Sequence, residues 1–369
     1  LASQIRSVVR RVAVNCMGRV NDPSQVDSII AEHHADMVGM VRGLICDPDF
    51  VKKARDGRTD EIRQCVGCEE GCYGRFRRGL PITCAYNPEA GREAEMTIEY
   101  ASAKKKVMII GGGVAGLEAA RVAAARGHSV SIYEKEKEIG GQLRLAAKAP
   151  RRDDFEQIPR YYAYQAGLLD IEMHLDVEVD RELVDRTGPD AVIVATGSVP
   201  RVLDVPVSDD AHVLDVRSVL NGEPVSGENI VVVAGEHGME ALTVADFLSE
   251  RGKFVTVVTE FFYAGSEAPF GVLQAVYTRL LRKGVSFATL SAISAIRANM
   301  IVLRNVFTGQ ESTMEKVDTV VSALGSDPRD ALAVELRESG YDVWVIGDCR
   351  QARFLPQVTF EAAQVARWI

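Results

Sequence analysis

The sequence predicts an α/β protein in which two Rossmann-like nucleotide-binding units, one inserted in the other, follow the end of a (βα)8 barrel. Three observations predict this class. A buried-type strand at 107–110 runs into a glycine-rich turn, a helix and a second strand at 129–133, which completes a βαβ unit. A second unit of this kind begins at 230–233. The first 60 residues add a strand, a helix and another strand, the repeating pattern of an α/β barrel.

The composition is that of a globular, acidic protein. The 369 residues carry a net charge of −9, with 47% hydrophobic and 26% charged residues, which suits two or three domains. The acidic balance argues against a nucleic-acid partner, because such surfaces need clustered excess Lys and Arg. The chain has no apolar run of roughly 18 residues or more and no charged segment leading into an apolar stretch at its N-terminus. We therefore expect no membrane association and a cytoplasmic location.

Residues 1–60 are predicted to be the last two βα units of the barrel. The expected elements are a helix-like stretch at 5–11, a strand at 12–15, a helix that starts at Asp22 and a strand at 36–42. A basic residue, Arg19 or Arg42, stands at the end of each strand. That end of a barrel holds the active site, and the loops after strands seven and eight often bind a phosphate. Taken alone, an Arg after a strand is more often solvated or salt-bridged.

Four cysteines lie in a loop-rich segment that, with its connector, is predicted to span 61–100. Their spacing is Cys65-x2-Cys68-x3-Cys72-x11-Cys84. A compact group of three thiolates plus one more distant thiolate can converge on one inorganic centre, which predicts a [4Fe–4S] cluster. Structural zinc is the competing interpretation, although zinc sites usually come as two short knuckles. The scattered cysteines 16, 46 and 349 are interpreted as buried or incidental thiols.

The first nucleotide-binding unit is predicted to comprise 101–225 and 326–369. Its fingerprint, Gly111-x-Gly113-x-x-Gly116, lies between a buried strand and an apolar helix, where a pyrophosphate would meet the backbone. Glu134 ends the next strand and is placed to accept hydrogen bonds from a ribose diol. The following Gly140-Gly141-Gln142-Leu143 favours a flavin dinucleotide over a nicotinamide dinucleotide.

The inserted unit, 226–325, lacks the glycine positions of the fingerprint. After the strand at 230–233 the sequence continues Ala234-Gly235-Glu236-His237-Gly238-Met239-Glu240. Glu236 and Glu240 would repel a pyrophosphate at the N-terminus of the following helix. We therefore expect a degenerate domain in which binding of NAD(P)H is doubtful. No Ser-His-Asp set, zinc-hydrolase helix or phosphate-transfer loop is visible.

Taken together, these motifs resemble the iron-sulfur flavoprotein family of trimethylamine dehydrogenase, histamine dehydrogenase and 2,4-dienoyl-CoA reductase. The resemblance covers nearly the whole chain and corresponds to the C-terminal portion of that family. It rests on Gly18-Arg19, Arg42-x-x-Ile45-x-Asp47-Pro48, Ile62-Arg63-x-Cys65, Asn87-Pro88, Gly91-Arg92-Glu93, the Gly111 fingerprint, Ala195-Thr196-Gly197 and Gly347-Asp348.

The resemblance implies a set of cofactors and residues. FMN would lie in a full barrel, of which this chain holds only the end, with Arg19 and Arg42 as partial phosphate ligands. The four cysteines would hold the [4Fe–4S] cluster, and the first nucleotide-binding unit would hold FAD or ADP. The residues implied for that nucleotide are Gly111, Gly113, Gly116, Glu134, Gly141, Gln142, Thr196, Gly197, Gly347 and Asp348. Residues that transform the substrate would lie in the missing part of the barrel, so none is expected in this chain.

The resemblance also implies an activity and partners. We expect an oxidoreductase portion that passes electrons between FMN, the cluster and an acceptor in amine or N-methyl-amine oxidation. The acceptor would be an electron-transferring flavoprotein or another redox partner, and the protein would be a homo-oligomer. One alternative is an NAD(P)H-dependent 2,4-dienoyl-CoA or enoate reductase, and another is a non-catalytic electron-transfer subunit. The abrupt start within a barrel pattern favours a fragment of a longer chain over a separate polypeptide.

Overall fold

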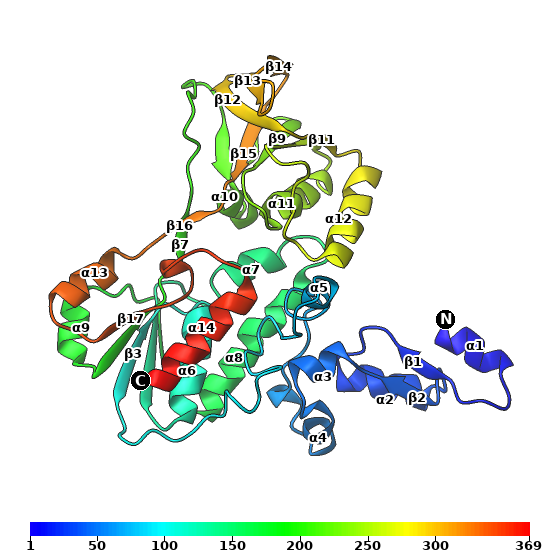
Figure 1. Cartoon of the computed structure of the whole chain (residues 1–369), viewed down its shortest axis with the longest axis vertical. Helices are drawn as coiled ribbons and strands as arrows, with labels where there is room; N and C mark the ends of the chain where they lie inside the picture. The colour runs from blue at the N-terminus through cyan, green and yellow to red at the C-terminus, as the bar shows by residue number, and fades with distance from the viewer.

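The computed structural model describes all 369 residues, which form three parts (Figure 1). A small N-terminal segment extends to one side, and two α/β units, each built on a five-stranded parallel sheet, lie one above the other. The cysteine segment lies where these three parts meet. None of the helices combines the length and the apolar character needed to cross a bilayer.

The N-terminal segment contains one parallel strand pair. Its elements are α1 (Ala2–Val8), β1 (Asn15–Met17), α2 (Pro23–Ala31), β2 (Met37–Gly39), α3 (Arg42–Cys46), α4 (Phe50–Arg55) and η1 (Thr59–Glu61). The Asp22 side chain caps α2 by accepting a hydrogen bond from the N–H of Ser24 at 2.7 Å. β1 and β2 pair in parallel with α2 between them, as expected, but both strands are shorter than predicted. That this segment ends a barrel stays a prediction.

The cysteine segment has almost no regular structure. Its one helix is α5 (Tyr73–Arg77), whose N-cap residue is Cys72. Asn87 attaches the segment to the preceding part, since its side-chain amide donates to the carbonyl of Cys46 at 2.9 Å. The rest of the segment depends on packing against its neighbours.

The first α/β unit has the strand order β17-β6-β3-β4-β5. The strands are β3 (Lys106–Ile110), β4 (Ser129–Glu134), β5 (Glu172–Leu175), β6 (Ala191–Val194) and β17 (Val343–Val345). The helices are α6 (Val114–Ala125), α7 (Gln142–Ala147), α8 (Gln157–Leu168), α9 (Arg181–Thr187), α13 (Ala331–Glu338) and α14 (Leu355–Trp368), with the short turns η2 (Asp153–Glu156) and η3 (Gly347–Cys349). Residues 107–110 are buried on both faces of the sheet, which explains the unbroken apolar run of β3.

The second α/β unit has the strand order β11-β10-β9-β15-β8. The strands are β8 (Val213–Asp215), β9 (Asn229–Ala234), β10 (Phe254–Thr259), β11 (Ser286–Ala288) and β15 (Thr319–Ala323). Helices α10 (Val216–Asn221), α11 (Glu240–Ser249) and α12 (Phe270–Arg282) pack on one face. An antiparallel sheet of β12 (Ser291–Arg297), β13 (Met300–Asn305) and β14 (Glu311–Glu315) packs on the other.

Two short strands join the units. β7 (Ser198–Pro200) and β16 (Ser326–Pro328) pair in antiparallel fashion where the chain leaves the first sheet and where it returns. β8 and α10 fall within the predicted range 101–225, yet β8 pairs with β15 of the second sheet. The second unit therefore begins before residue 226, because the strand pairing, which local sequence does not report, decides where β8 belongs.

Candidate functional site

The turn between β3 and α6 has the shape that a bound pyrophosphate requires. Gly111 has a φ of +112°, and a Cβ there would collide with the carbonyl oxygen of Ala195. A Cβ on Gly116 would collide with the carbonyl oxygen of Gly111, so this glycine lets α6 pack against the turn. A Cβ on Gly113 would meet no atom within 4 Å, because this residue borders an open cavity. A phosphate could therefore approach the backbone at Gly113.

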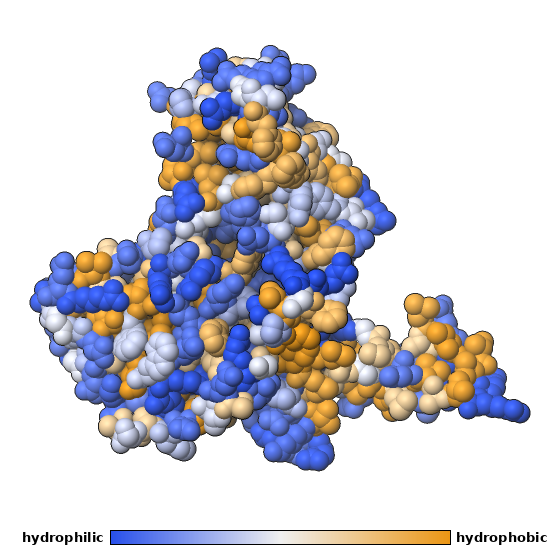
Figure 2. Space-filling model, viewed as in Figure 1, coloured by the Kyte–Doolittle hydropathy of each residue, from blue (hydrophilic) through white to orange (hydrophobic).

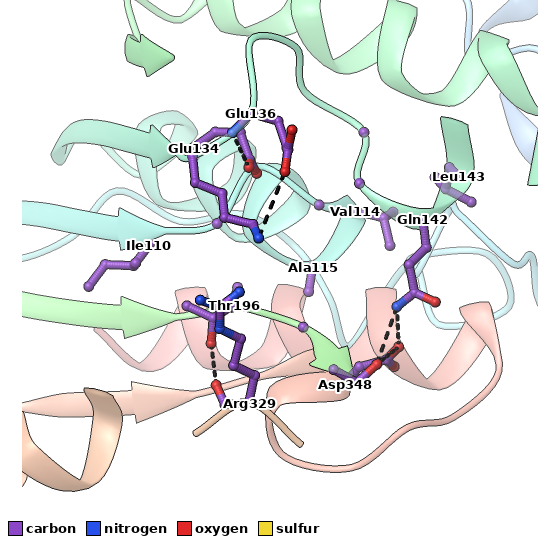
Figure 3. Close-up of a pocket in the computed structure, with 18 of the residues that line it drawn as sticks. Ile110, Val114, Ala115, Glu134, Glu136, Gln142, Leu143, Thr196, Arg329 and Asp348 are labelled. Atoms are coloured by element: carbon purple, nitrogen blue, oxygen red, sulfur yellow. Dashed lines mark hydrogen bonds and ion pairs between the residues drawn. The ribbon is translucent and has the colours of Figure 1, made fainter. Parts of the chain in front are cut away.

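Glu134, at the end of β4, is held in place by the same turn. One carboxylate oxygen accepts the N–H of Gly112 at 2.7 Å, and the other accepts the N–H of Glu136 at 2.9 Å (Figure 3). The side chain is buried, yet it lines the cavity. Each oxygen keeps a lone pair that could accept a hydrogen bond from a ribose hydroxyl.

The loop after β4 closes the cavity from the opposite side. The N–H of Gly140 donates to the carbonyl of Gly112 at 2.8 Å, and a Cβ on Gly141 would lie 3.3 Å from the Cα of Gly113. The amide of Gln142 donates to Asp348 at 2.8 Å, and these two side chains point toward one another across the cavity (Figure 3). The structure thus brings the predicted residues of three distant segments to one place.

The end of β6 and the turn after β17 form the floor of the cavity. The hydroxyl of Thr196 donates to the carbonyl of Arg329 at 2.6 Å, and Gly197 follows with a φ of +75°. Gly347 lies against α6, where a Cβ would stand 2.7 Å from the Cβ of Ala115. The next residue, Asp348, lines the cavity, whereas Gly347 contacts α6 and does not line the cavity.

The cavity has a volume of about 740 Å³ and extends well beyond the fingerprint. Its far end is lined by side chains that the sequence analysis did not single out: Leu145, Lys148, Arg217 and Asn221. Arg217 comes from α10 of the second unit and donates to the carbonyl of Ser198 at 2.5 Å and to the hydroxyl of Ser326 at 2.8 Å. Burial lowers the pKa of Arg217, whereas the negative charges of Glu240 and Asp348 act to raise it. No local motif marks these residues, because only the contact between the units brings them to the cavity.

The cysteine loop packs directly against the first unit. Cys65, Cys68 and Cys84 adjoin the same hydrophobic core as β3, α6 and α14. Within the loop, a Cβ on Gly71 would stand 2.6 Å from the carbonyl carbon of Cys84, so Gly71 is required for the two cysteine segments to touch. The N–H of Thr83 donates to the carbonyl of Gly71 at 2.7 Å and holds this contact.

The four thiols lie near one another, since the charge of Cys84 acts on Cys65, Cys68 and Cys72. Burial, followed by the charges of Glu70 and Cys84, raises the pKa of Cys68 well above its usual range. A hydrogen bond from the thiol of Cys46 lowers the pKa of Cys84 to about 6. As the side chains stand, no three His, Cys, Asp or Glu residues are arranged as a ready metal site. The donor set fits an iron-sulfur centre, and the cluster itself stays a prediction.

Cys46 was interpreted as a buried or incidental thiol; the structure buries it, and it lies beside Cys84, a contact that the sequence analysis did not predict. Its distance in sequence from the other four cysteines concealed this contact. The contact of Cys46, the last residue of α3, could have been predicted only from the fold of the N-terminal segment.

Arg19 and Arg42 both lie at the cysteine loop. Arg19 forms an ion pair with Asp154, and a Cβ on Gly67 would stand 3.1 Å from its guanidinium. Arg42 forms an ion pair with Glu69 at 3.0 Å. The two predicted phosphate-binding side chains thus border the loop, each with a carboxylate partner, and their role toward FMN stays a prediction.

In the second unit, a carboxylate occupies the N-terminus of α11. Glu236 accepts hydrogen bonds from the N–H groups of Gly238 and Glu240. Burial, followed by the charge of Glu240, raises the pKa of Glu236 to about 7. The backbone donors that would receive a pyrophosphate are therefore already paired.

Comparisons with known proteins show that this chain is similar to oxidoreductases. Residues 105–368 match the family model described as "Pyridine nucleotide-disulphide oxidoreductase". The chain is 34% identical to the bilirubin reductase of Mediterraneibacter gnavus, over 94% of this chain and 53% of that protein. It is 33% identical to the N,N-dimethylglycine/sarcosine dehydrogenase of Chromohalobacter salexigens, over 92% of this chain and 50% of the relative. The chain thus spans about half the length of the curated relatives it matches.

A solved structure shares the whole fold of this chain. The histamine dehydrogenase of Rhizobium sp. 4-9 superposes with a TM-score of 0.90 at 25% identity, over 100% of this chain and 60% of that enzyme. The match includes the N-terminal segment and the cysteine loop, because it covers every residue. The fold around the cavity is therefore that of a redox enzyme.

Proposed function

The chain belongs to the pyridine nucleotide-disulphide oxidoreductase family and corresponds to the C-terminal portion of flavoenzymes of the histamine dehydrogenase type, and from this premise we propose its role. It is the electron-transferring part of an oxidoreductase that acts on amines or N-methyl amines. The substrate is a small molecule that would be bound by barrel residues beyond those in this sequence. Electrons pass on to an electron-transferring flavoprotein or another redox protein, and the assembly is a homo-oligomer.

One observation carries the proposal: the cysteine loop and the dinucleotide cavity share a single hydrophobic core. Val66 and Tyr86 of the loop are buried in the same cluster as Ile109 of β3 and Leu117 of α6. Such packing holds two redox groups at a fixed separation, which electron transfer between them requires. A loop that merely covered the surface would not need a buried position in that core.

We propose FAD in the cavity and a [4Fe–4S] cluster on Cys65, Cys68, Cys72 and Cys84. When bound, these groups would accept and release electrons. Gly111 and Gly113 would receive the pyrophosphate, and Glu134 would orient the adenosine ribose. Arg19 and Arg42 would hold the phosphate of FMN in the complete barrel.

The volume of the cavity, about 740 Å³, supports FAD over ADP. Besides the pyrophosphate turn, its lining includes the apolar Leu143 and Leu355 and the charged Lys148 and Arg217. Apolar walls with a few polar groups at the end are what a flavin ring needs, whereas ADP would leave that space to water. Extraction of the native nucleotide followed by mass analysis distinguishes the two.

The cofactor inventory tests the proposal. We expect about four irons and an equal amount of sulfide per chain, together with an adenine dinucleotide. If zinc is found without sulfide, the loop holds a structural metal and does not carry electrons. Absence of both iron and flavin from protein prepared without oxygen would overturn the proposal.

A second candidate is an NAD(P)H-dependent reductase of enoates or enoyl-CoA esters. The similarity to a protein named cinnamate reductase, at 30% identity over 99% of this chain and 54% of that protein, favours it. The carboxylate of Glu236 at the N-terminus of α11 argues against it, because that position would receive the pyrophosphate of the second nucleotide. Anaerobic mixing of the holoenzyme with NADH or NADPH separates the candidates, since rapid bleaching of the flavin would favour the reductase.

A further inference from the structure

One arginine links the second unit to both of the strands that join the two units. Arg217 lies in the first turn of α10, where its backbone N–H donates to the capping side chain of Asp215 at 2.7 Å. Its guanidinium donates to the carbonyl of Ser198 at 2.5 Å, to the hydroxyl of Ser198 at 2.9 Å and to the hydroxyl of Ser326 at 2.8 Å. Ser198 begins β7 and Ser326 begins β16. Every partner of Arg217 at this junction therefore belongs to the chain itself.

The junction depends on polar contacts. Figure 1 places β7 and β16 between the two units, and Figure 2 shows hydrophilic residues on the surface where the units meet. Directly after β7, Arg201 forms an ion pair with Asp327 of β16 at 2.9 Å. Arg201 does not line the nucleotide cavity, whereas Arg217 does. The position of Arg217 is thus not required merely to join the two strands.

Arg217 reaches two predicted nucleotide-binding residues through one hydroxyl group. Ser198 is buried, and its Oγ lies 3.4 Å from Oδ2 of Asp348 and 3.4 Å from Nε2 of Gln142. A serine hydroxyl has one proton to donate and two lone pairs that accept. Because two donors, Arg217 and Gln142, occupy the lone pairs, the hydroxyl proton points to Asp348. Arg217 therefore fixes the direction of a hydrogen bond that holds Asp348 in the cavity.

The charge of Arg217 is not neutralised by an ion pair in direct contact. Each hydrogen bond of its guanidinium goes to a neutral oxygen of one of the two serines. Burial lowers its pKa, and the charges of Glu240, Asp348 and Asp215 oppose this effect from beyond contact distance. The neighbouring cation in the lining, Lys148, donates to an amide oxygen of α10 at 3.4 Å. Such cations stabilise a bound group that gains negative charge.

A reduced flavin carries more negative charge at neutral pH than an oxidised flavin, so a nearby cation favours the reduced form. We propose that Arg217 is a positioning residue for the bound FAD, which holds Asp348 through Ser198 and raises the reduction potential of the flavin. This inference rests on the proposed function, because it takes FAD as the nucleotide. It gives the second unit a role at the first nucleotide site, although the second unit lacks a fingerprint of its own.

Replacement of Arg217 in the holoenzyme tests the proposal. Arg217→Met should weaken the binding of FAD to the flavin-depleted protein by about tenfold or more. In an anaerobic titration with redox dyes, the midpoint potential of one flavin should fall by about 30 mV, which corresponds to tenfold for a two-electron couple. Arg217→Lys keeps the charge but loses the forked contact with the two serines. It should therefore restore most of the potential and little of the affinity.

Arg201→Met is the matched control, because it removes another contact between the same two strands without altering the lining of the cavity. It should bind FAD within about twofold of the unchanged protein, at an unchanged midpoint. Equal effects of Arg201→Met and Arg217→Met would overturn the inference, since the strand pair would then be responsible.

The remaining outcomes separate the inference from the proposed function. If Arg217→Met binds FAD with the affinity and midpoint of the unchanged protein, the inference is wrong and the proposed function stands. If Arg217→Met does not fold, Arg217→Lys decides, because an unchanged FAD affinity in that variant would also overturn the inference. If the unchanged protein binds no FAD, the proposed cofactor and the inference are both wrong.

Discussion

The carboxylate of Glu236 accepts the N–H of Gly238 and thereby occupies the helix end where a second dinucleotide would place its phosphates. The same carboxylate is largely buried, and burial together with Glu240 raises its pKa to about 7. We therefore expect Glu236 to make the stability of the second unit depend on pH.

Because of Glu236, the free energy of unfolding should fall as the pH rises through neutrality. The folded form binds a proton more tightly than the unfolded chain, whose carboxyl has a pKa near the ordinary value of about 4.5. The favourable contribution is therefore complete below about pH 4.5 and is lost as pH rises to about 7. Glu236→Gln should be more stable than the unchanged protein at pH 8, by on the order of 2–3 kcal/mol after discounting for partial exposure.

Thermal unfolding at pH 5 and pH 8 measures this effect. The difference between Glu236→Gln and the unchanged protein should shrink at pH 5. Glu223→Gln, at an exposed position, serves as the control and should show no such pH dependence. A pH-independent difference for Glu236→Gln would contradict the prediction.

Two glycines of the fingerprint should respond differently to alanine. Gly113→Ala adds a methyl group that meets no protein atom, so the fold should persist while the bound nucleotide is lost. Gly111→Ala should also lose the nucleotide. Because Gly111 has a φ of +112° and an added Cβ would collide with Ala195, this variant should in addition lower the free energy of unfolding by about 1–3 kcal/mol. Nucleotide content after gel filtration and the unfolding midpoint of the nucleotide-free protein separate the two effects. Full nucleotide content in Gly113→Ala would show that no phosphate lies there.

Replacement of Cys68 by Ala should remove the cluster and loosen residues 61–93. The loop has little regular structure, so without an organising centre it retains only its packing against the first core. Iron and sulfide content and amide hydrogen exchange report the two consequences. Cys16→Ala, in β1, is the matched control and should leave both unchanged. An unaltered visible spectrum in Cys68→Ala would contradict the assignment of the cluster.

A buried charge network joins the loop to α6 and should be costly to break. Glu118 is fully buried and accepts from Arg121 at 2.8 Å and from Tyr162 at 2.8 Å, while Arg63 of the loop lies 3.9 Å away. Arg121→Met leaves this carboxylate partly unpaired and should cost about 3–5 kcal/mol. The matched control Arg186→Met, on the exposed face of α9, should change the stability by less than about 0.5 kcal/mol.

Denaturant unfolding measures the cost of breaking the network. The double variant Glu118→Gln/Arg121→Met should recover part of the loss, since the uncompensated charge is then absent. An equal or greater loss in the double variant would assign the cost to packing instead of charge.

Sequence motifs predicted much of the first unit because the constraints behind them involve residues close together in the sequence. A glycine that must adopt positive φ, such as Gly111, or that must let two backbones touch, such as Gly116, is visible in sequence as a fixed spacing. The same holds for the apolar run of β3, whose side chains are buried on both faces. The absence of the fingerprint from the second unit was equally readable, because His237 and Glu240 stand where its second and third glycines are needed.

The sequence by itself therefore determined that there are two α/β units, which of them carries the glycine fingerprint, and which cysteines are grouped. Only the tertiary structure assigned β8 to the second sheet, placed Arg217 at the far end of the cavity and buried Cys46 beside Cys84. These three features depend on contacts between segments that are far apart in the sequence. The free energy of such contacts comes from shape and burial at the meeting surfaces, which no spacing within one segment records.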